Sequence, residues 1–194
     1  MKQFLTFCLL VITCTFPLQA DNLIQNSDFS EGIDHWHGNG QAPADFKPAD
    51  PFAAPDPLTS KGMIITLKNK DWTKVAQDFK GKASTGVLTI TYAVSPDLAF
   101  STKAEDYVNM PGHIDYNGWR AFNTRQGEWV AFLSDFGSSH GTYYMIKPKL
   151  GASTPQTMKM NIKAMTPLED KTITLAFPPG SGLVVILNVE LTDQ

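Results

Sequence analysis

The chain has 194 residues, of which 42% are hydrophobic and 18% are charged, and its formal net charge is −3. A chain of this length can bury most of its apolar surface as one domain, so a second domain is not required. Binding the phosphate backbone of a nucleic acid needs clustered Lys and Arg, and the sequence contains no long basic run. No nucleic acid is therefore expected as a partner.

The first twenty residues have the pattern of a signal peptide. Lys2 supplies the positive start, residues 4–16 are apolar, and residues 17–20 form a break that ends in a small residue. We expect cleavage before Asp21 and a secreted product, either extracellular or periplasmic. No later stretch approaches the roughly 20 apolar residues that a spanning helix needs, so we expect no transmembrane segment and a soluble mature protein.

Both cysteines, Cys8 and Cys14, lie inside this leader. The mature chain would contain no thiol and no disulfide, and the loss of Lys2 would change the net charge from −3 to about −4. A lipoprotein with a lipid on Cys14 is the alternative, although Thr13 stands where such a signal has a smaller residue. We expect a monomer whose stability comes from a buried core.

Alternation of apolar and polar residues dominates from about Gly62 onward and predicts β-strands. Residues 157–164 are the clearest case, because Met158, Met160 and Ile162 share one face and lysines and polar residues share the other. Further strands are predicted over residues 62–68, 73–79, 86–95, 128–134 and 142–147.

The last two predicted strands cover residues 172–177 and 182–192. Turn-forming residues 178–182 separate them, so we expect a hairpin. The second of these strands is apolar at every other residue from Leu183 to Leu191, and Val184 and Ile186 add apolar residues on its other face. This pattern predicts a central strand.

Short strands joined by turns predict an all-β fold, an antiparallel β-sandwich of the jelly-roll kind, with residues 21–194 as a single domain. A helical turn is expected near residues 101–108. The Pro-rich stretch 41–59 is expected to be an irregular surface loop. Residues 96–118 are the better functional candidate, because binding residues concentrate in loops on rigid sheets.

The mature N-terminus reads Asn-Leu-Ile-Gln-Asn-Ser-Asp-Phe-Ser-Glu-Gly-Ile-Asp-His-Trp over residues 22–36. This segment resembles the opening of jelly-roll carbohydrate-binding modules of the galactose-binding-like superfamily, of the cellulose- and xylan-binding type. Residues 75–79, 86–95 and 184–191 look like later strands of the same modules in the same order. The resemblance implies a jelly roll that binds a poly- or oligosaccharide without catalysis.

Many of these modules hold a structural calcium ion between the acidic opening turn and the last strand. The resemblance places Asp28 and Asn188 at metal-binding positions, while Ser27 and Ser30 replace the family's Gly and Glu. Calcium needs about six to eight oxygen ligands, so these departures leave the ion as an open possibility. The large aromatics of the turn, Phe29 and Trp36, are expected in the core.

One stretch combines the side chains that sugars need, namely aromatic rings for stacking and planar polar groups for hydroxyls. Its candidate ligand-binding residues are Asp115, Tyr116, Asn117, Trp119 and Arg120. The alternative is a turn in which Trp119 enters the core. Secondary aromatic candidates, for each of which packing is the favoured interpretation, are Trp129, Trp72, Tyr143 and Tyr144.

Three other patterns give weaker evidence for a function. Residues 137–141 match G-x-S-x-G, but they lie between two predicted strands and no His follows His140, so a turn is expected instead of a serine-hydrolase elbow. His35 and His37 would point the same way on an extended strand, yet a zinc site would need further distant ligands. Carboxylate pairs for glycoside hydrolysis, such as Glu105 with Asp106 or Asp115 with Glu128, are open because sequence does not show their separation.

The sequence thus predicts a secreted carbohydrate-binding protein that is not an enzyme. Two alternatives remain, an extracellular structural or adhesive sandwich that binds no sugar, and a small polysaccharide-active enzyme. Exposed aromatics would favour sugar binding, and fully buried aromatics would favour the structural role.

Overall fold

The computed structural model is built almost entirely of β-strands. It describes residues 21–38, 46–48, 62–68, 70–79, 85–107, 127–135, 141–151, 154–163 and 171–193. No helix among these residues has the length and apolar character needed to cross a membrane.

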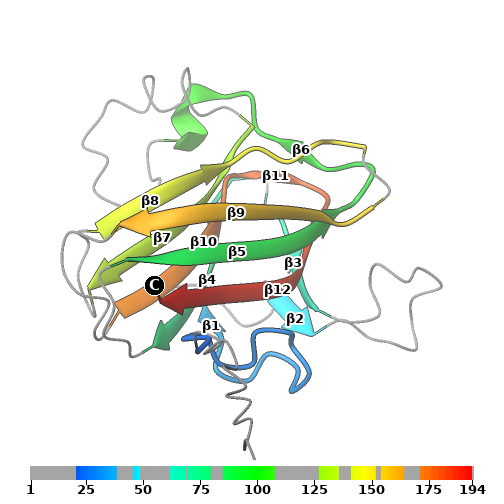
Figure 1. The fold of residues 1–194 in the computed structure, drawn as a ribbon. Coiled ribbons are helices and arrows are strands. Elements are labelled where there is room, and N and C mark those ends of the chain that lie inside the picture. The colour runs from blue at the N-terminus through cyan, green and yellow to red at the C-terminus, as the bar shows by residue number, and fades with distance from the viewer. Residues whose placement is uncertain are drawn as a thin grey trace, which may run out of the picture.

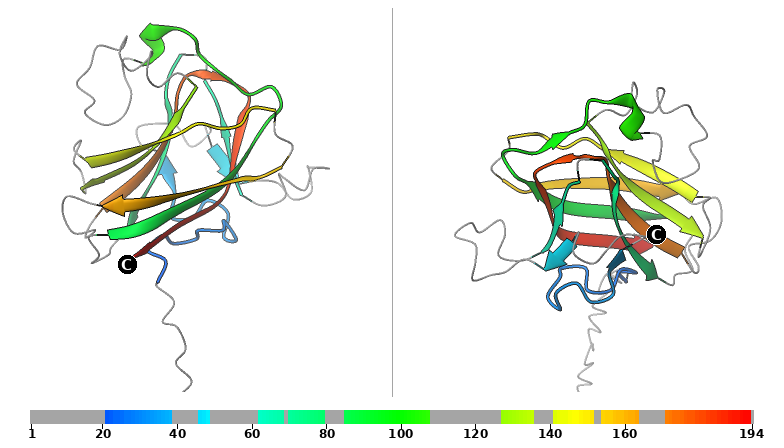
Figure 2. Two further views of the ribbon diagram at one scale, coloured as in Figure 1. Left: turned by 45° about the horizontal axis from the view of Figure 1, so that its top comes forward. Right: turned by 180° about the vertical axis from the view of Figure 1, so that it is seen from behind.

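Two five-stranded antiparallel sheets form the two layers of a sandwich (Figure 1). The first sheet has the order β1-β4-β10-β7-β8, with the bounds His37–Gly38, Thr73–Phe79, Lys171–Phe177, Trp129–Asp135 and Gly141–Ile146. The second sheet has the order β2-β3-β12-β5-β9, with the bounds Phe46–Pro48, Met63–Thr66, Leu183–Asp193, Thr85–Val94 and Gln156–Lys163. The left view of Figure 2 shows the layers apart. The predicted antiparallel β-sandwich is confirmed.

The core lies between the two layers and follows from the alternation along each strand. On β4, Val75 and Phe79 face the core, and on β10 Ile173, Leu175 and Phe177 do so, all with at most 4% of their surface exposed. Burying one such side chain contributes about 1.5–3 kcal/mol, so the core is a main source of stability for the described residues, which contain no cysteine.

The central strand of the second sheet is β12, which pairs with β3 on one side and with β5 on the other. This position confirms the prediction of a central strand, which was based on apolar residues on both of its faces. The register with β5 shifts between Ile186 and Asn188, which marks a β-bulge. As a result Val184 and Ile186 enter the core before the bulge, and Val189 and Leu191 enter it afterwards. The single alternating face predicted from Leu183 onward therefore changes phase at the bulge.

The predicted hairpin between the last two strands is wrong. β10 pairs with β4 and β7 in the first sheet, whereas β12 pairs with β3 and β5 in the second. The connecting residues form β11 (Gly180–Ser181), which pairs with β6 (Ala99–Phe100) where the chain passes from one layer to the other. Adding a Cβ to Gly180 would bring it within 2.3 Å of a backbone oxygen of Ala99, so only glycine fits this crossing.

A short 3₁₀ helix, η2 (Ala104–Tyr107), confirms the helical turn expected in this region. The indole Nε1 of Trp72 donates a hydrogen bond to the backbone oxygen of Asp106 at 3.0 Å. The Ser101 hydroxyl donates to the carboxylate of the same residue. The first contact joins the helix to the residue before β4, and the second holds the helix to the segment that leads into it.

Candidate functional site

The two outward faces of the sandwich carry different polar groups. On the outer face of the second sheet, Thr157, Lys159 and Asn161 of β9 are exposed, and the hydroxyls of Thr91 and Thr157 lie 3.0 Å apart. Val185 of β12 and Ala93 of β5 are buried outside the core cluster. The outer face of the first sheet has more such buried residues and a group of polar side chains from neighbouring strands, so it is the candidate site.

The middle of the outer face of the first sheet is apolar and buried, although it points away from the core. Ala76, Ala176 and Val130 are 0% exposed and Phe132 is 5% exposed. None of the four belongs to the core cluster between the sheets. The strand register sets Ala76 opposite Thr174 and Thr174 opposite Phe132, so these side chains form a row across β4, β10 and β7.

Polar groups lie beside this row, further along β4 and β10. The Thr172 hydroxyl on β10 donates to Oδ1 of Asp78 on β4 at 2.6 Å. The Nε2 atom of His37 on β1 lies 3.7 Å from Oδ2 of the same carboxylate, and the His37 and Asp78 side chains are each about half exposed (52% and 43%). Three neighbouring strands thus present an acceptor, a hydroxyl and an imidazole to the solvent.

Lys74 of β4 lies on the same face, on the opposite side of the row from Asp78, and its register partner is Ala176. It is half-buried, and this burial lowers the pKa of its ammonium group. No salt bridge joins Lys74 to any residue that the structure describes. The candidate site therefore consists of a carboxylate, a hydroxyl and an imidazole on one side of a buried row, with a cation on the other side.

The ligand residues predicted from the sequence, Asp115, Tyr116, Asn117, Trp119 and Arg120, all lie outside the described residues. Trp129 is described, and it is 0% exposed. Its ring stacks on Phe177 at 4.8 Å and meets Tyr92 edge-on at 5.4 Å. Trp129 is therefore a core residue and not a surface that stacks on a ligand. Trp72 is also buried, and Tyr144 packs partly against the core.

The opening turn places Phe29 and Trp36 in the core, as expected, with their rings 5.6 Å apart. Both metal candidates are engaged with protein groups. Oδ1 of Asp28 accepts a hydrogen bond from the Ser30 backbone at 3.1 Å, and Nδ2 of Asn188 donates to Glu190 at 2.8 Å. The described ranges hold no cluster of three or more metal-binding side chains of the His, Cys, Asp or Glu types. The calcium ion stays a prediction from the resemblance.

The two histidines near the opening turn do not lie on one extended strand. His35 has a φ of 71° and its imidazole lies 3.9 Å from Glu31, whereas His37 belongs to β1 and faces Asp78. The G-x-S-x-G stretch connects β7 and β8, which are antiparallel neighbours, and its first four residues lie outside the described part of the chain. The expected turn stays a prediction.

Sequence reasoning missed the groups on the outer face of the first sheet. Alternation does put Lys74, Ala76 and Asp78 on the face of β4 opposite the core, which is a usable signal. The partners are far away in sequence, however, since Asp78 and Thr172 are 94 residues apart. Nothing in the local pattern of either strand indicates that the two pair.

Comparison with known proteins gives the fold its class. No protein-family model matches the chain, and no curated protein matches it in sequence. A family 61 carbohydrate-binding module in complex with β-1,4-galactotriose superposes with a TM-score of 0.50 at 11% identity, covering 90% of this chain and 100% of the module. A family 16 carbohydrate-binding module gives 0.51 at 14% identity, with 89% and 100% covered.

An arabinose-bound α-L-arabinofuranosidase gives a TM-score of 0.54 at 7% identity, and 88% of this chain covers 26% of that enzyme. The same sandwich thus occurs both as a whole module and as a minor part of a larger enzyme. The chain has the jelly-roll sandwich fold of carbohydrate-binding modules.

Proposed function

We propose that this is a secreted, non-catalytic protein that binds a poly- or oligosaccharide. The observation that carries the proposal is the group of solvent-facing polar side chains on the outer face of the first sheet, where Asp78, Thr172 and His37 offer an acceptor, a hydroxyl and an imidazole. Groups of these kinds recognise sugar hydroxyls by hydrogen bonding. The fold shared with a module that binds β-1,4-galactotriose supports the same function.

The residues proposed from the sequence complete this assignment. Asp115, Tyr116, Asn117, Trp119 and Arg120 would add a stacking ring and planar hydrogen-bonding groups to the ligand contacts. Secretion is proposed from the leader-like residues 1–20.

The non-catalytic assignment is supported by the contacts that the carboxylate on the candidate face makes. Glycoside hydrolysis uses two carboxyl groups about 5–10 Å apart, one of them protonated. The partners of Asp78 among the described residues are the Thr172 hydroxyl and the His37 imidazole. Such a group suits the recognition of a sugar hydroxyl.

A structural or adhesive sandwich is the second candidate function, because one observation favours it. The aromatic side chains whose burial is described are all buried or partly buried, and the large hydrophobic residue that stands out as exposed is Leu150. A buried aromatic set strengthens packing and offers no open ring for stacking. Sugar binding would then require aromatics from residues 108–126, where Tyr116 and Trp119 lie.

Affinity electrophoresis of the mature protein against a panel of neutral and acidic polysaccharides tests the proposal. We expect retardation by at least one polysaccharide, and at least a five-fold weaker affinity for Asp78→Ala, which corresponds to the loss of about 1 kcal/mol. Lys159→Ala on the outer face of the second sheet is the matched control and should bind like the wild type. Equal weakening by both substitutions would count against the proposed face.

A further inference from the structure

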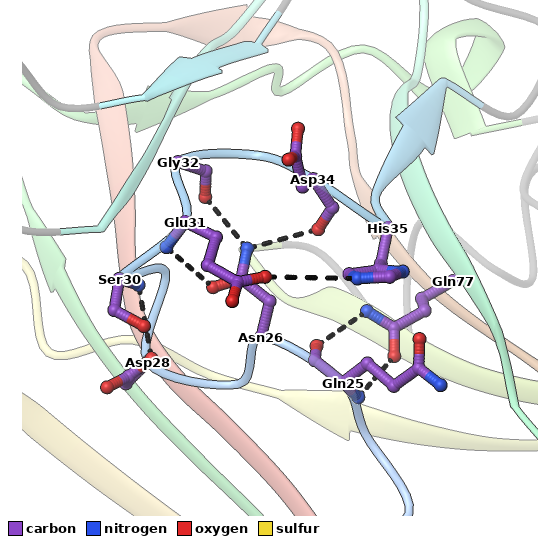
Figure 3. A network of polar contacts seen from close by, with 9 residues as sticks. All are labelled: Gln25, Asn26, Asp28, Ser30, Glu31, Gly32, Asp34, His35 and Gln77. Atoms are coloured by element: carbon purple, nitrogen blue, oxygen red, sulfur yellow. Dashed lines mark hydrogen bonds and ion pairs between the residues drawn. The ribbon is translucent and has the colours of Figure 1, made fainter.

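The opening turn is organised around the side chain of one residue, Asn26 (Figure 3). Its Nδ2 atom donates hydrogen bonds to the backbone oxygens of Gly32 and Asp34, at 3.1 and 3.0 Å. Its Oδ1 atom accepts a hydrogen bond from the backbone nitrogen of Glu31 at 3.0 Å. One carboxamide thus makes three hydrogen bonds to residues five to eight positions further along the chain.

Asn26 suits this position because its backbone φ is 45°, in the left-handed region that Asn tolerates better than most residues. Its own backbone oxygen also accepts a hydrogen bond from Phe29 at 3.2 Å. The hydrogen bonds of Asn26 therefore hold the turn together, and the rings of Phe29 and Trp36 pack together on its core side.

Backbone oxygens that converge on one point are what a bound cation usually brings together in an irregular turn. Here the Nδ2 hydrogens of Asn26 occupy that point and satisfy the oxygens of Gly32 and Asp34. A calcium ion in the same place would need about six to eight oxygens and would have to displace these hydrogen bonds.

The carboxylates of the turn are directed elsewhere. Asp28 accepts from the Ser30 backbone, Glu31 lies beside His35, and in Figure 3 the Asp34 carboxylate points away from the Asn26 amide. The link to the closing strand is also made without an ion, because the Val189 backbone nitrogen donates to the Ser27 oxygen at 2.9 Å. These groups do not fit the calcium site that the opening motif implies.

We propose that the Asn26 carboxamide takes the place of a structural metal ion, so that the opening turn folds and holds its shape without calcium. The same geometry also predicts the effect of a substitution at Asn26. Replacing the NH₂ group by oxygen, as in Asn26→Asp, sets a carboxylate against two backbone oxygens, an arrangement that is repulsive until a cation bridges it. One substitution should therefore convert a metal-independent turn into a calcium-responsive one.

Thermal unfolding in a chelator and in millimolar calcium chloride tests this proposal on the mature protein. The wild type should have the same Tm in both conditions. Asn26→Asp should lose about 5–10 °C in the chelator, through three disturbed hydrogen bonds, and should recover part of the loss in calcium, because an ion that binds only the folded state raises Tm.

Two further variants keep the test decisive. Asn26→Gly tolerates the positive φ but has no side chain, so we expect a lower Tm that calcium does not change. Asn161→Asp makes the same chemical change on the exposed face of β9 and should leave Tm unchanged in both conditions. The proposal is overturned if calcium raises the wild-type Tm, if Asn26→Asp melts like the wild type in the chelator, or if its loss is the same with and without calcium.

Discussion

The indole ring of Trp129 on β7 meets the ring of Tyr92 on β5 edge-on, with centroids 5.4 Å apart and an interplanar angle of 87°. Because β7 belongs to the first sheet and β5 to the second, this contact joins the two layers. Phe177 on β10 stacks on the same indole, with centroids 4.8 Å apart. An aromatic pair of this geometry adds about 0.5–1.5 kcal/mol beyond the area that it buries.

Trp129→Ala should therefore destabilise the protein strongly. Removing a fully buried aromatic ring leaves a cavity between the sheets and costs about 3–5 kcal/mol. Urea denaturation measures the loss, with Leu150→Ala as the control, because Leu150 is 58% exposed and should change stability by less than about 0.5 kcal/mol. A loss below about 1 kcal/mol for Trp129→Ala would contradict its place in the core.

Lys74 gives a prediction that depends on pH. Burial lowers the pKa of its ammonium group in the folded state below 10.5, so the charged form is less favourable folded than unfolded. This cost is fully present below the folded-state pKa and disappears as the pH rises through that pKa toward 10.5. Lys74→Met should therefore be at least as stable as the wild type at pH 7.

The measurement compares the free energies of unfolding of the wild type and Lys74→Met at pH 7 and at pH 10. We expect the advantage of the variant to shrink at the higher pH, because the wild-type lysine then loses its charge. Lys159→Met, at an exposed position of β9, controls for the loss of a positive charge. An advantage that grows with pH would contradict the effect of burial.

The leader gives a prediction about the mature chain. Cleavage before Asp21 removes Cys8 and Cys14, so the secreted protein should have no thiol and its Tm should not respond to a reducing agent. Intact-mass analysis of secreted material checks the new N-terminus. A mass that corresponds to a protein still containing Cys14, above all with an added lipid, would contradict this prediction and support the lipoprotein alternative.

Local periodicity predicted the strands well, because each strand buries one face and the pattern is written in its own residues. β4 has the predicted bounds, and β9 has its polar residues exposed and Ile162 in the core. The pairing between strands, in contrast, could not be predicted from local periodicity. The five residues between β10 and β12 have the chemistry of a hairpin turn, yet they carry the chain between layers, because β11 pairs with β6.

Contacts between distant segments were harder to predict for the same reason. The reciprocal pair formed by the Gln77 side chain with the Gln25 backbone, at 2.8 and 2.9 Å, spans 52 residues and has no local signature (Figure 3). In the candidate site, Asp78 and Thr172 each sit on the polar side of an alternating strand, which is where a solvated residue would also be. Only the register of β4 against β10 brings them together.

Trp119 separates ligand binding from packing within the stretch proposed to contact sugar. If it stacks on the ligand, Trp119→Ala should weaken polysaccharide binding by a term on the order of 1 kcal/mol, about five-fold, and leave the free energy of unfolding nearly unchanged. If it packs in the core, the substitution should instead cost about 3–5 kcal/mol of stability. Denaturation and affinity electrophoresis on this one variant distinguish the two cases, and a large stability loss would rule out the binding role.

Carbohydrate binding itself is tested most directly by a glycan-array screen of the mature protein, with folding verified on the same sample by a cooperative thermal transition. We expect binding to a restricted set of poly- or oligosaccharides, reduced in Asp78→Ala and unchanged in Lys159→Ala. A folded protein that binds no glycan on the array would contradict the proposed carbohydrate binding and favour the structural or adhesive sandwich.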